Sequence, residues 1–164
     1  MRFLVDPTGT RVAQARPPVR AFLGFALLAV AALLLQRASG GLLAPSEVEL
    51  HYLGAADGEG LPSAALWEGL HADAFLYGFV LFMLGALLPL CRLRPAARST
   101  LYSASVAVAL ADLAAPFLVV AIGGGGALRV ATTALVGVLL PTTIVAVFAT
   151  FGPGAVAPSE RADA

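Results

Sequence analysis

Residues 66–90 constrain this chain more than any other stretch, because a segment so long and so apolar fits best across a lipid bilayer. About 20 apolar residues suffice to span the hydrocarbon core as a helix. The whole chain of 164 residues is 59% hydrophobic and 12% charged, with a mean hydropathy of +0.89. Too few polar side chains remain to cover a water-soluble domain. We therefore predict an integral membrane protein.

Three further apolar runs complete the predicted membrane domain. The four spans are expected at about residues 21–36, 66–90, 101–122 and 128–151. The last two runs are rich in alanine, glycine, serine and threonine, which let helix backbones approach closely. The prediction is an all-α four-helix bundle that forms one domain over residues 1–164. Its partner is the lipid bilayer, and self-association or docking on a larger membrane complex stays open.

The first run is the shortest, since only residues 21–35 are apolar between Arg20 and the pair Gln36–Arg37. We expect residues 1–20 to form a polar tail, and the two arginines to extend their side chains to the interfaces. The alternative is a signal peptide cleaved near residues 38–40. Arg37 inside that cleavage region and the long preceding segment disfavour it.

The segment 37–65 is the one sizeable loop, and it contains a predicted short helix at 47–53. Ser46 and Glu49 have the spacing of a capping box, and Gly54 provides the stop. The positive-inside rule gives the orientation of this loop. Arg37 and Arg129 are on its side of the membrane, whereas the other eight arginines are in the tails or the linker 91–100. Both termini are therefore predicted to be cytoplasmic.

The composition also narrows the location and the class of function. Every basic residue is arginine, and the abundance of alanine, glycine and proline indicates a GC-rich bacterial genome. We expect a multi-pass protein of a bacterial inner (plasma) membrane. The zero net charge gives no case for nucleic acid, and a single cysteine, Cys91, excludes an internal disulfide. No serine or cysteine is paired with a base at a catalytic spacing, so an enzyme is disfavoured.

Two Glu/His pairs on the outer side suggest a metal site. Glu47 and His51 share one face of the predicted loop helix, and Glu68 and His71 share one face of the second span. Glu-x-x-His on an inward face is half of the motif in carboxylate-bridged metal bundles. Our first hypothesis is thus a non-enzymatic membrane protein that binds a transition metal through these four residues. Interfacial residues wetted by water would give the same pattern.

A haem b between the two histidines is the less favoured cofactor, because His51 belongs to a loop rather than a span. A redox subunit is the corresponding alternative function. The chain offers only two histidines, so it can hold at most one bis-histidine haem.

Asp112 raises another alternative, a small proton or cation transporter or a subunit of one. A carboxylate in mid-span is costly and often belongs to an ion path. Pro116 leaves the Asp112 carbonyl without its intrahelical donor, so carboxylate and carbonyl together could form a cation or proton site. A protonated Asp112 bonded to Ser105, Thr132, Thr133 or Thr142 as helix glue explains the residue equally well. Asp73 is a further candidate ion site, with Arg129 as its natural neighbour.

The order of these features resembles a family of small four-span bacterial membrane proteins with no established function. The resemblance is carried by Ser46, His51 and Tyr52 in the loop, His71 and Asp73 at the start of the second span, and Asp112 in the third. The second position of the His-x-Asp motif is often histidine in that family, so Asp73 departs from the pattern. The resemblance implies that His51, His71 and Asp112 should be tested together, and it implies no activity.

Overall fold

The computed structural model describes residues 10–55, 60–91 and 93–151, and every regular element in these ranges is helical. The elements are α1 (Thr10–Ser39), α2 (Pro45–Leu53), α3 (Ser63–Leu87), the 3-10 turn η2 (Leu88–Leu90), α4 (Pro95–Ile122) and α5 (Gly126–Thr150). Within these ranges, four helices are long and apolar enough to cross a membrane: Arg16–Ser39, Ser63–Leu90, Pro95–Ile122 and Gly126–Thr150. The prediction of an all-α, four-span bundle is confirmed.

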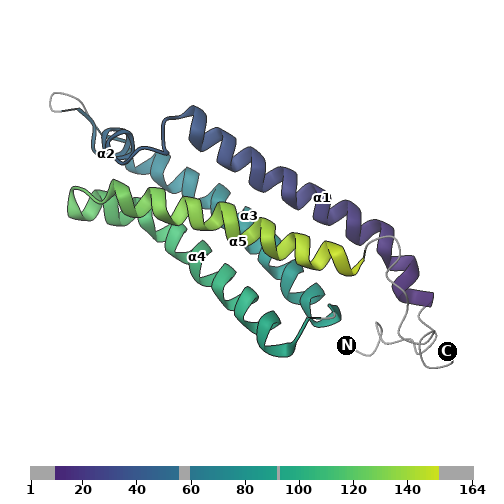
Figure 1. Cartoon of the computed structure of the whole chain (residues 1–164). Helices are drawn as coiled ribbons and strands as arrows, with labels where there is room; N and C mark the ends of the chain where they lie inside the picture. Colours follow the sequence, from purple (N-terminus) through teal and green to yellow (C-terminus); the bar gives the residue numbers. More distant parts are fainter. Residues whose placement is uncertain (1–9, 56–59, 92, 152–164) are drawn as a thin grey trace.

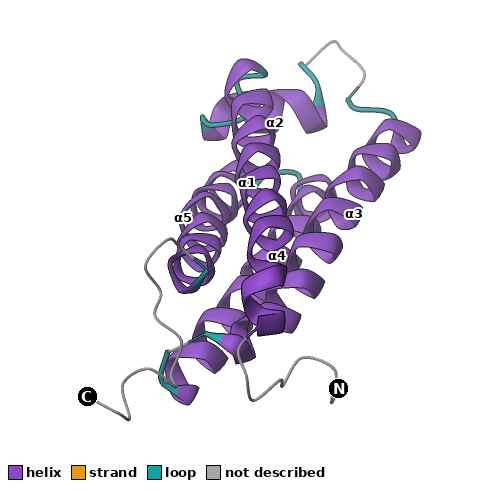
Figure 2. Ribbon diagram, turned by 90° about the vertical axis from the view of Figure 1, so that its right-hand side faces the viewer, coloured by secondary structure: helices purple, strands orange, loops and turns teal. Residues whose placement is uncertain are grey.

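The long helices run lengthwise along the bundle, and each runs in the opposite direction to the one before it in the chain (Figure 1). The end of α1, the short α2, the start of α3 and the α4–α5 turn lie at one end, which we name the outer end. The α3–α4 connection and the last turn of α5 lie at the opposite, inner end. Helix α5 packs against α1, α3 and α4. Figure 2 shows α3 diverging from α1 toward the outer end.

Helix α1 begins well before the predicted span. Residues 10–20 were expected to be a polar tail, but they are helical from Thr10, through Pro17 and Pro18; residues 1–9 lie outside the described part. Side-chain packing supports the last residues of this extension. Val19 packs against the main core, and the Arg20 guanidinium lies 5.5 Å from the centre of the Phe148 ring in α5.

Small residues and one glycine turn hold α4 and α5 together. Gly123 ends α4 with φ 72°, and Gly125 precedes α5 with φ 91°, both in the left-handed region that favours glycine. Farther along the pair, the buried Ser105 and Thr143 hydroxyls lie 3.1 Å apart in a hydrogen bond across the two helices. Such close contacts are typical of membrane helices that associate through small and hydroxyl-bearing residues.

Helix α2 closes the outer end of the bundle and is joined to α5. Val48 and Tyr52 are buried in a small cluster with Val119 of α4. The capping box predicted for Ser46 and Glu49 is wrong, because α2 has no side-chain cap. Glu49 Oε1 instead accepts a hydrogen bond of 3.0 Å from the backbone N–H of Gly126. A helix that begins with glycine has no capping side chain of its own, so α2 supplies one.

Candidate functional site

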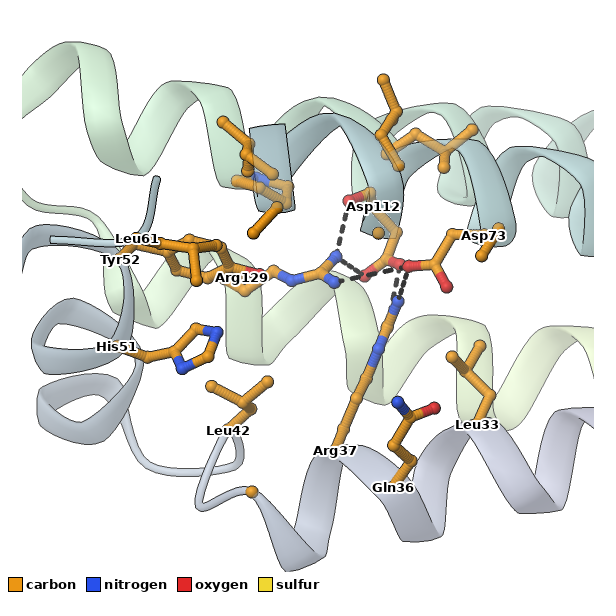
Figure 3. A pocket seen from close by; sticks show the side chains of 18 of the residues that line it. Leu33, Gln36, Arg37, Leu42, His51, Tyr52, Leu61, Asp73, Asp112 and Arg129 are labelled. Carbon is orange, nitrogen blue, oxygen red and sulfur yellow. Dashed lines mark hydrogen bonds and ion pairs between the residues drawn. The ribbon is translucent and has the colours of Figure 1, made fainter. Parts of the chain in front are cut away.

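Asp112 is the centre of a buried polar cluster in the outer half of the bundle. Its side chain is 0% exposed, and both carboxylate oxygens receive hydrogen bonds or ion pairs (Figure 3). Oδ1 lies 2.7 Å from Arg129 Nη1, 3.0 Å from the Thr132 hydroxyl and 3.2 Å from the Thr133 hydroxyl; Oδ2 lies 2.7 Å from the Tyr77 hydroxyl and 2.9 Å from Arg37 Nη1. All these partners are donors, which is the pattern of an ionised carboxylate.

Asp73 joins the same cluster through the two arginines. Its Oδ2 accepts a hydrogen bond of 2.7 Å from Arg37 Nη2 and lies 3.8 Å from Arg129 Nη2. Arg129 was the neighbour expected for Asp73, but Arg37 is the closer cation. Arg37, Asp73, Asp112 and Arg129 together form what we name the ion network. Two guanidinium groups balance two carboxylates, so the ion network carries no net charge.

The positions of these residues along their helices place the ion network within the membrane. Asp73 precedes Leu90 by 17 residues, and Asp112 follows Arg98 by 14 residues. A rise of 1.5 Å per residue puts Asp73 about 25 Å from Leu90 and Asp112 about 21 Å from Arg98, measured along the helix axes. Because the hydrocarbon core is about 30 Å thick, the ion network belongs to its outer half.

A pocket of about 470 Å³ opens above the ion network. Its floor contains Arg37, Asp73, Asp112 and Arg129, and its walls are mainly apolar (Figure 3). The apolar lining residues are Leu33, Leu42, Leu61, Leu66, Leu70, Leu113 and Pro116. His51 and Tyr52 of α2 line the outer part. Small residues stand between the leucines on the α3 side, among them Gly69, where an added Cβ atom would meet no neighbouring atom within 4 Å.

One donor atom and one acceptor atom of the ion network are left for a ligand. Arg129 is 4% exposed, and its Nη1 bonds to both the carboxylate and the carbonyl of Asp112. Its Nη2 is 3.8 Å from Asp73 Oδ2, beyond hydrogen-bonding distance, and makes no hydrogen bond within the described residues. Asp73 Oδ1 likewise has no hydrogen bond within the described residues. The pocket therefore offers one strong donor and one strong acceptor at its floor.

The predicted metal ligands are dispersed. Glu47, Glu68 and His71 are exposed, and none of them lines the pocket. His51 is also exposed and lines the pocket, with its ring edge-on to Tyr52 at a centroid distance of 5.0 Å. Within residues 10–55, 60–91 and 93–151, no three His, Cys, Asp or Glu side chains form a group that could hold a metal ion. The metal site and the haem site remain predictions.

The expected hydrogen-bond partners of Asp112 are only partly those observed. Thr132 and Thr133 do bond to its carboxylate, as the helix-glue interpretation requires. Ser105 bonds to Thr143 instead, and Thr142 donates to the Val138 carbonyl of its own helix. The helices are thus joined at Asp112 by an ion network rather than by a protonated acid.

Sequence reasoning missed Arg37 and Tyr77. Arg37 was expected at the interface, but it is 4% exposed and extends into the bundle. Counting the charges on the outer side of the membrane could have identified Arg37. The two carboxylates within the outer halves of the spans need two cations, and Arg37 and Arg129 are the two arginines predicted on that side. Tyr77 has no such signal, because one tyrosine in an apolar helix is ordinary.

Comparison with known families agrees with this architecture. A family described as a transmembrane helical domain matches residues 42–152, which include α2 to α5. The chain belongs to this family. The matched region contains Asp73, Asp112 and Arg129, whereas Arg37 precedes it. The resemblance to a family of four-span membrane proteins is thereby confirmed, as is a multi-pass membrane location. No curated protein and no solved structure matches the chain.

Proposed function

We propose that this protein binds a small, uncharged amphiphile in the outer pocket without transforming it chemically. The observation that supports the proposal is the unused pair at the pocket floor, Arg129 Nη2 and Asp73 Oδ1. A carbonyl or ester oxygen of the ligand would accept a hydrogen bond from Arg129. A hydroxyl group would donate one to Asp73. We place the protein in a bacterial inner membrane, as its composition suggests.

The charge of the ion network favours an uncharged head group. The four residues already balance one another, so a bound anion or cation would leave one uncompensated charge in a buried site. The leucine-rich walls favour an apolar body on the same molecule. A pocket of about 470 Å³ is within the range of small-molecule sites.

Three probes with the same acyl chain test the charge preference directly. They are a tritiated monoacylglycerol, which is uncharged, the matching fatty acid, which is anionic, and the matching alkylamine, which is cationic. Equilibrium binding to the amphipol-solubilised protein is expected to be saturable and at least tenfold tighter for the monoacylglycerol. Equal affinity for all three probes, or no saturable binding, would contradict the proposal.

Two glycine variants on α3 distinguish binding in the pocket from non-specific partition of the probe into the amphipol or onto the protein surface. Gly69→Leu places a side chain in the pocket and is expected to abolish saturable binding. Gly78→Leu is the matched control, because Gly78 is on the same helix, is exposed and does not line the pocket. Loss of binding in both variants, or in neither, would show that the probe does not occupy this pocket.

A second candidate is proton or cation transport past Asp112. The Ser105–Thr143 hydrogen bond favours it, because this buried polar pair lies two helical turns farther inward on the same face of α4 as Asp112. Proton flux in liposomes with a pH-sensitive dye tests this alternative. Flux is expected in the wild type and absent in Asp112→Asn. A wild type without flux would rule the alternative out.

The metal hypothesis has a separate test. Protein purified without chelators is expected to retain nearly one metal ion per chain, and His71→Ala to release it. Elemental analysis measures the metal, and an absorbance spectrum of the same sample detects a haem by its Soret band.

A further inference from the structure

A second groove lies at the inner end of the bundle, away from the ion network. Its volume is about 510 Å³, and it runs between the last turns of α3, η2 and the first turns of α4. The lining residues are Phe82, Gly85, Ala86, Leu88, Pro89, Pro95, Arg98, Ser99 and Tyr102. The groove is apolar toward the membrane centre and polar at the inner end.

The charge around this groove is strongly one-sided. The sequence from Asp73 to Asp112 has no acidic residue between these two, and its described part contains Arg94 and Arg98. Arg98 lines the groove, and its Nη1 donates a hydrogen bond of 2.7 Å to the Pro89 carbonyl oxygen. That bond holds the guanidinium at the rim. Within the described residues its other N–H groups have no partner, so they remain for an anion.

The apolar part of the groove depends on one close approach between helices. A Cβ atom on Gly85 would lie 3.0 Å from the Tyr102 hydroxyl, so glycine lets the Tyr102 ring lie against α3. Phe82 is 72% exposed and forms the lipid-side edge. The Tyr102 hydroxyl has no hydrogen bond in the described part of the chain. The groove thus combines an apolar channel with a hydroxyl and a guanidinium at one end.

We propose that the groove binds one anionic phospholipid from the leaflet at the inner end. The phosphate would accept hydrogen bonds from Arg98 and Ser99, and one acyl chain would lie along Phe82 and Ala86. Basic pockets between membrane helices on the cytoplasmic side suit anionic head groups. The bilayer supplies this ligand at the depth of the groove, and the local excess of arginine favours an anionic head group over a zwitterionic one.

Native mass spectrometry of the purified full chain tests the proposal with two lipids of identical acyl chains. Phosphatidylglycerol and phosphatidylcholine are added in equal amounts, and the lipid adducts are counted. Phosphatidylglycerol is expected to give a single-lipid adduct at least fivefold more abundant than that of phosphatidylcholine. Arg98→Gln is expected to remove this preference. Ala86→Phe, which fills the groove, is expected to lower adducts of both lipids.

Arg20→Gln is the matched control, because Arg20 belongs to the inner end but does not line the groove. It is expected to retain the full preference. Equal adducts of the two lipids in the wild type would overturn the proposal, as would an equal loss in Arg20→Gln and Arg98→Gln. If Arg98→Gln does not fold, Ala86→Phe decides: unchanged adducts in that variant would overturn the proposal.

Discussion

Arg129 Nη1 donates a hydrogen bond of 2.6 Å to the backbone carbonyl oxygen of Asp112. Pro116, four residues after Asp112, has no N–H, so this carbonyl lacks its usual donor within α4. The same nitrogen lies 2.7 Å from the Asp112 carboxylate. One guanidinium thus satisfies two acceptors of one residue, and the proline explains why an arginine is held there.

Arg129→Gln is expected to destabilise the bundle by about 3–5 kcal/mol, because only Arg37 then remains to neutralise the two carboxylates of the ion network, and one buried negative charge is uncompensated. The double variant Arg129→Gln with Asp112→Asn restores neutrality and is expected to recover much of that loss. The measurement is the unfolding free energy in mixed micelles, followed by circular dichroism. Arg94→Gln, at an exposed residue, is the control and should behave as the wild type. If Arg129→Gln were as stable as Arg94→Gln, the role assigned to Arg129 would be refuted.

Tyr77→Phe is expected to cost about 1–2 kcal/mol, since the hydroxyl donates to Asp112 at 2.7 Å and its loss leaves a buried acceptor with one donor fewer. Thermal unfolding in detergent measures the effect. Tyr52→Phe is the control, because the Tyr52 hydroxyl has no hydrogen bond among the described residues. Equal melting temperatures for the two variants would show that the Tyr77 hydroxyl contributes nothing.

Gly126→Ala is expected to loosen α2 from the bundle. A Cβ atom at Gly126 would collide with the Pro45 carbonyl, and backbone atoms cannot easily move away. Overpacking of this kind costs about 1–3 kcal/mol. Hydrogen exchange of the α2 amides should rise along with the loss of stability. Gly78→Ala has free space around its Cβ and should be neutral or slightly stabilising; faster α2 exchange in both variants would argue against the specific contact.

Single-cysteine labelling tests the predicted orientation. In a Cys91→Ala background, a membrane-impermeant maleimide should label Glu47→Cys in intact cells, because α2 is predicted outside. Arg94→Cys should react only after the membrane is opened. Both positions are exposed in the structure, so access to the reagent depends on topology alone. The opposite labelling pattern would invert the assignment of the outer and inner ends.

The fold could be predicted from the sequence to a greater extent than the site. The length of each apolar run identifies the four spans, because a helix needs a minimum number of apolar residues to cross the bilayer. Asp112 was identifiable for the same reason, since a mid-span carboxylate is costly. The choice of its partners depends on how α1 sits against α5, and Arg37 carries no local pattern that reveals this. The Glu/His pairs show the converse: spacing along one helix does not bring two helix faces together.

The order of the four charges along the chain has a consequence for how the protein enters the bilayer. Arg37 and Asp73 belong to the first pair of spans, α1 and α3, and lie 2.7 Å apart. Asp112 and Arg129 belong to the second pair, α4 and α5, and also lie 2.7 Å apart. Each helical hairpin therefore contains its own counter-ion. Each pair of spans can therefore enter the lipid with its buried charge already neutralised, before the other pair is inserted.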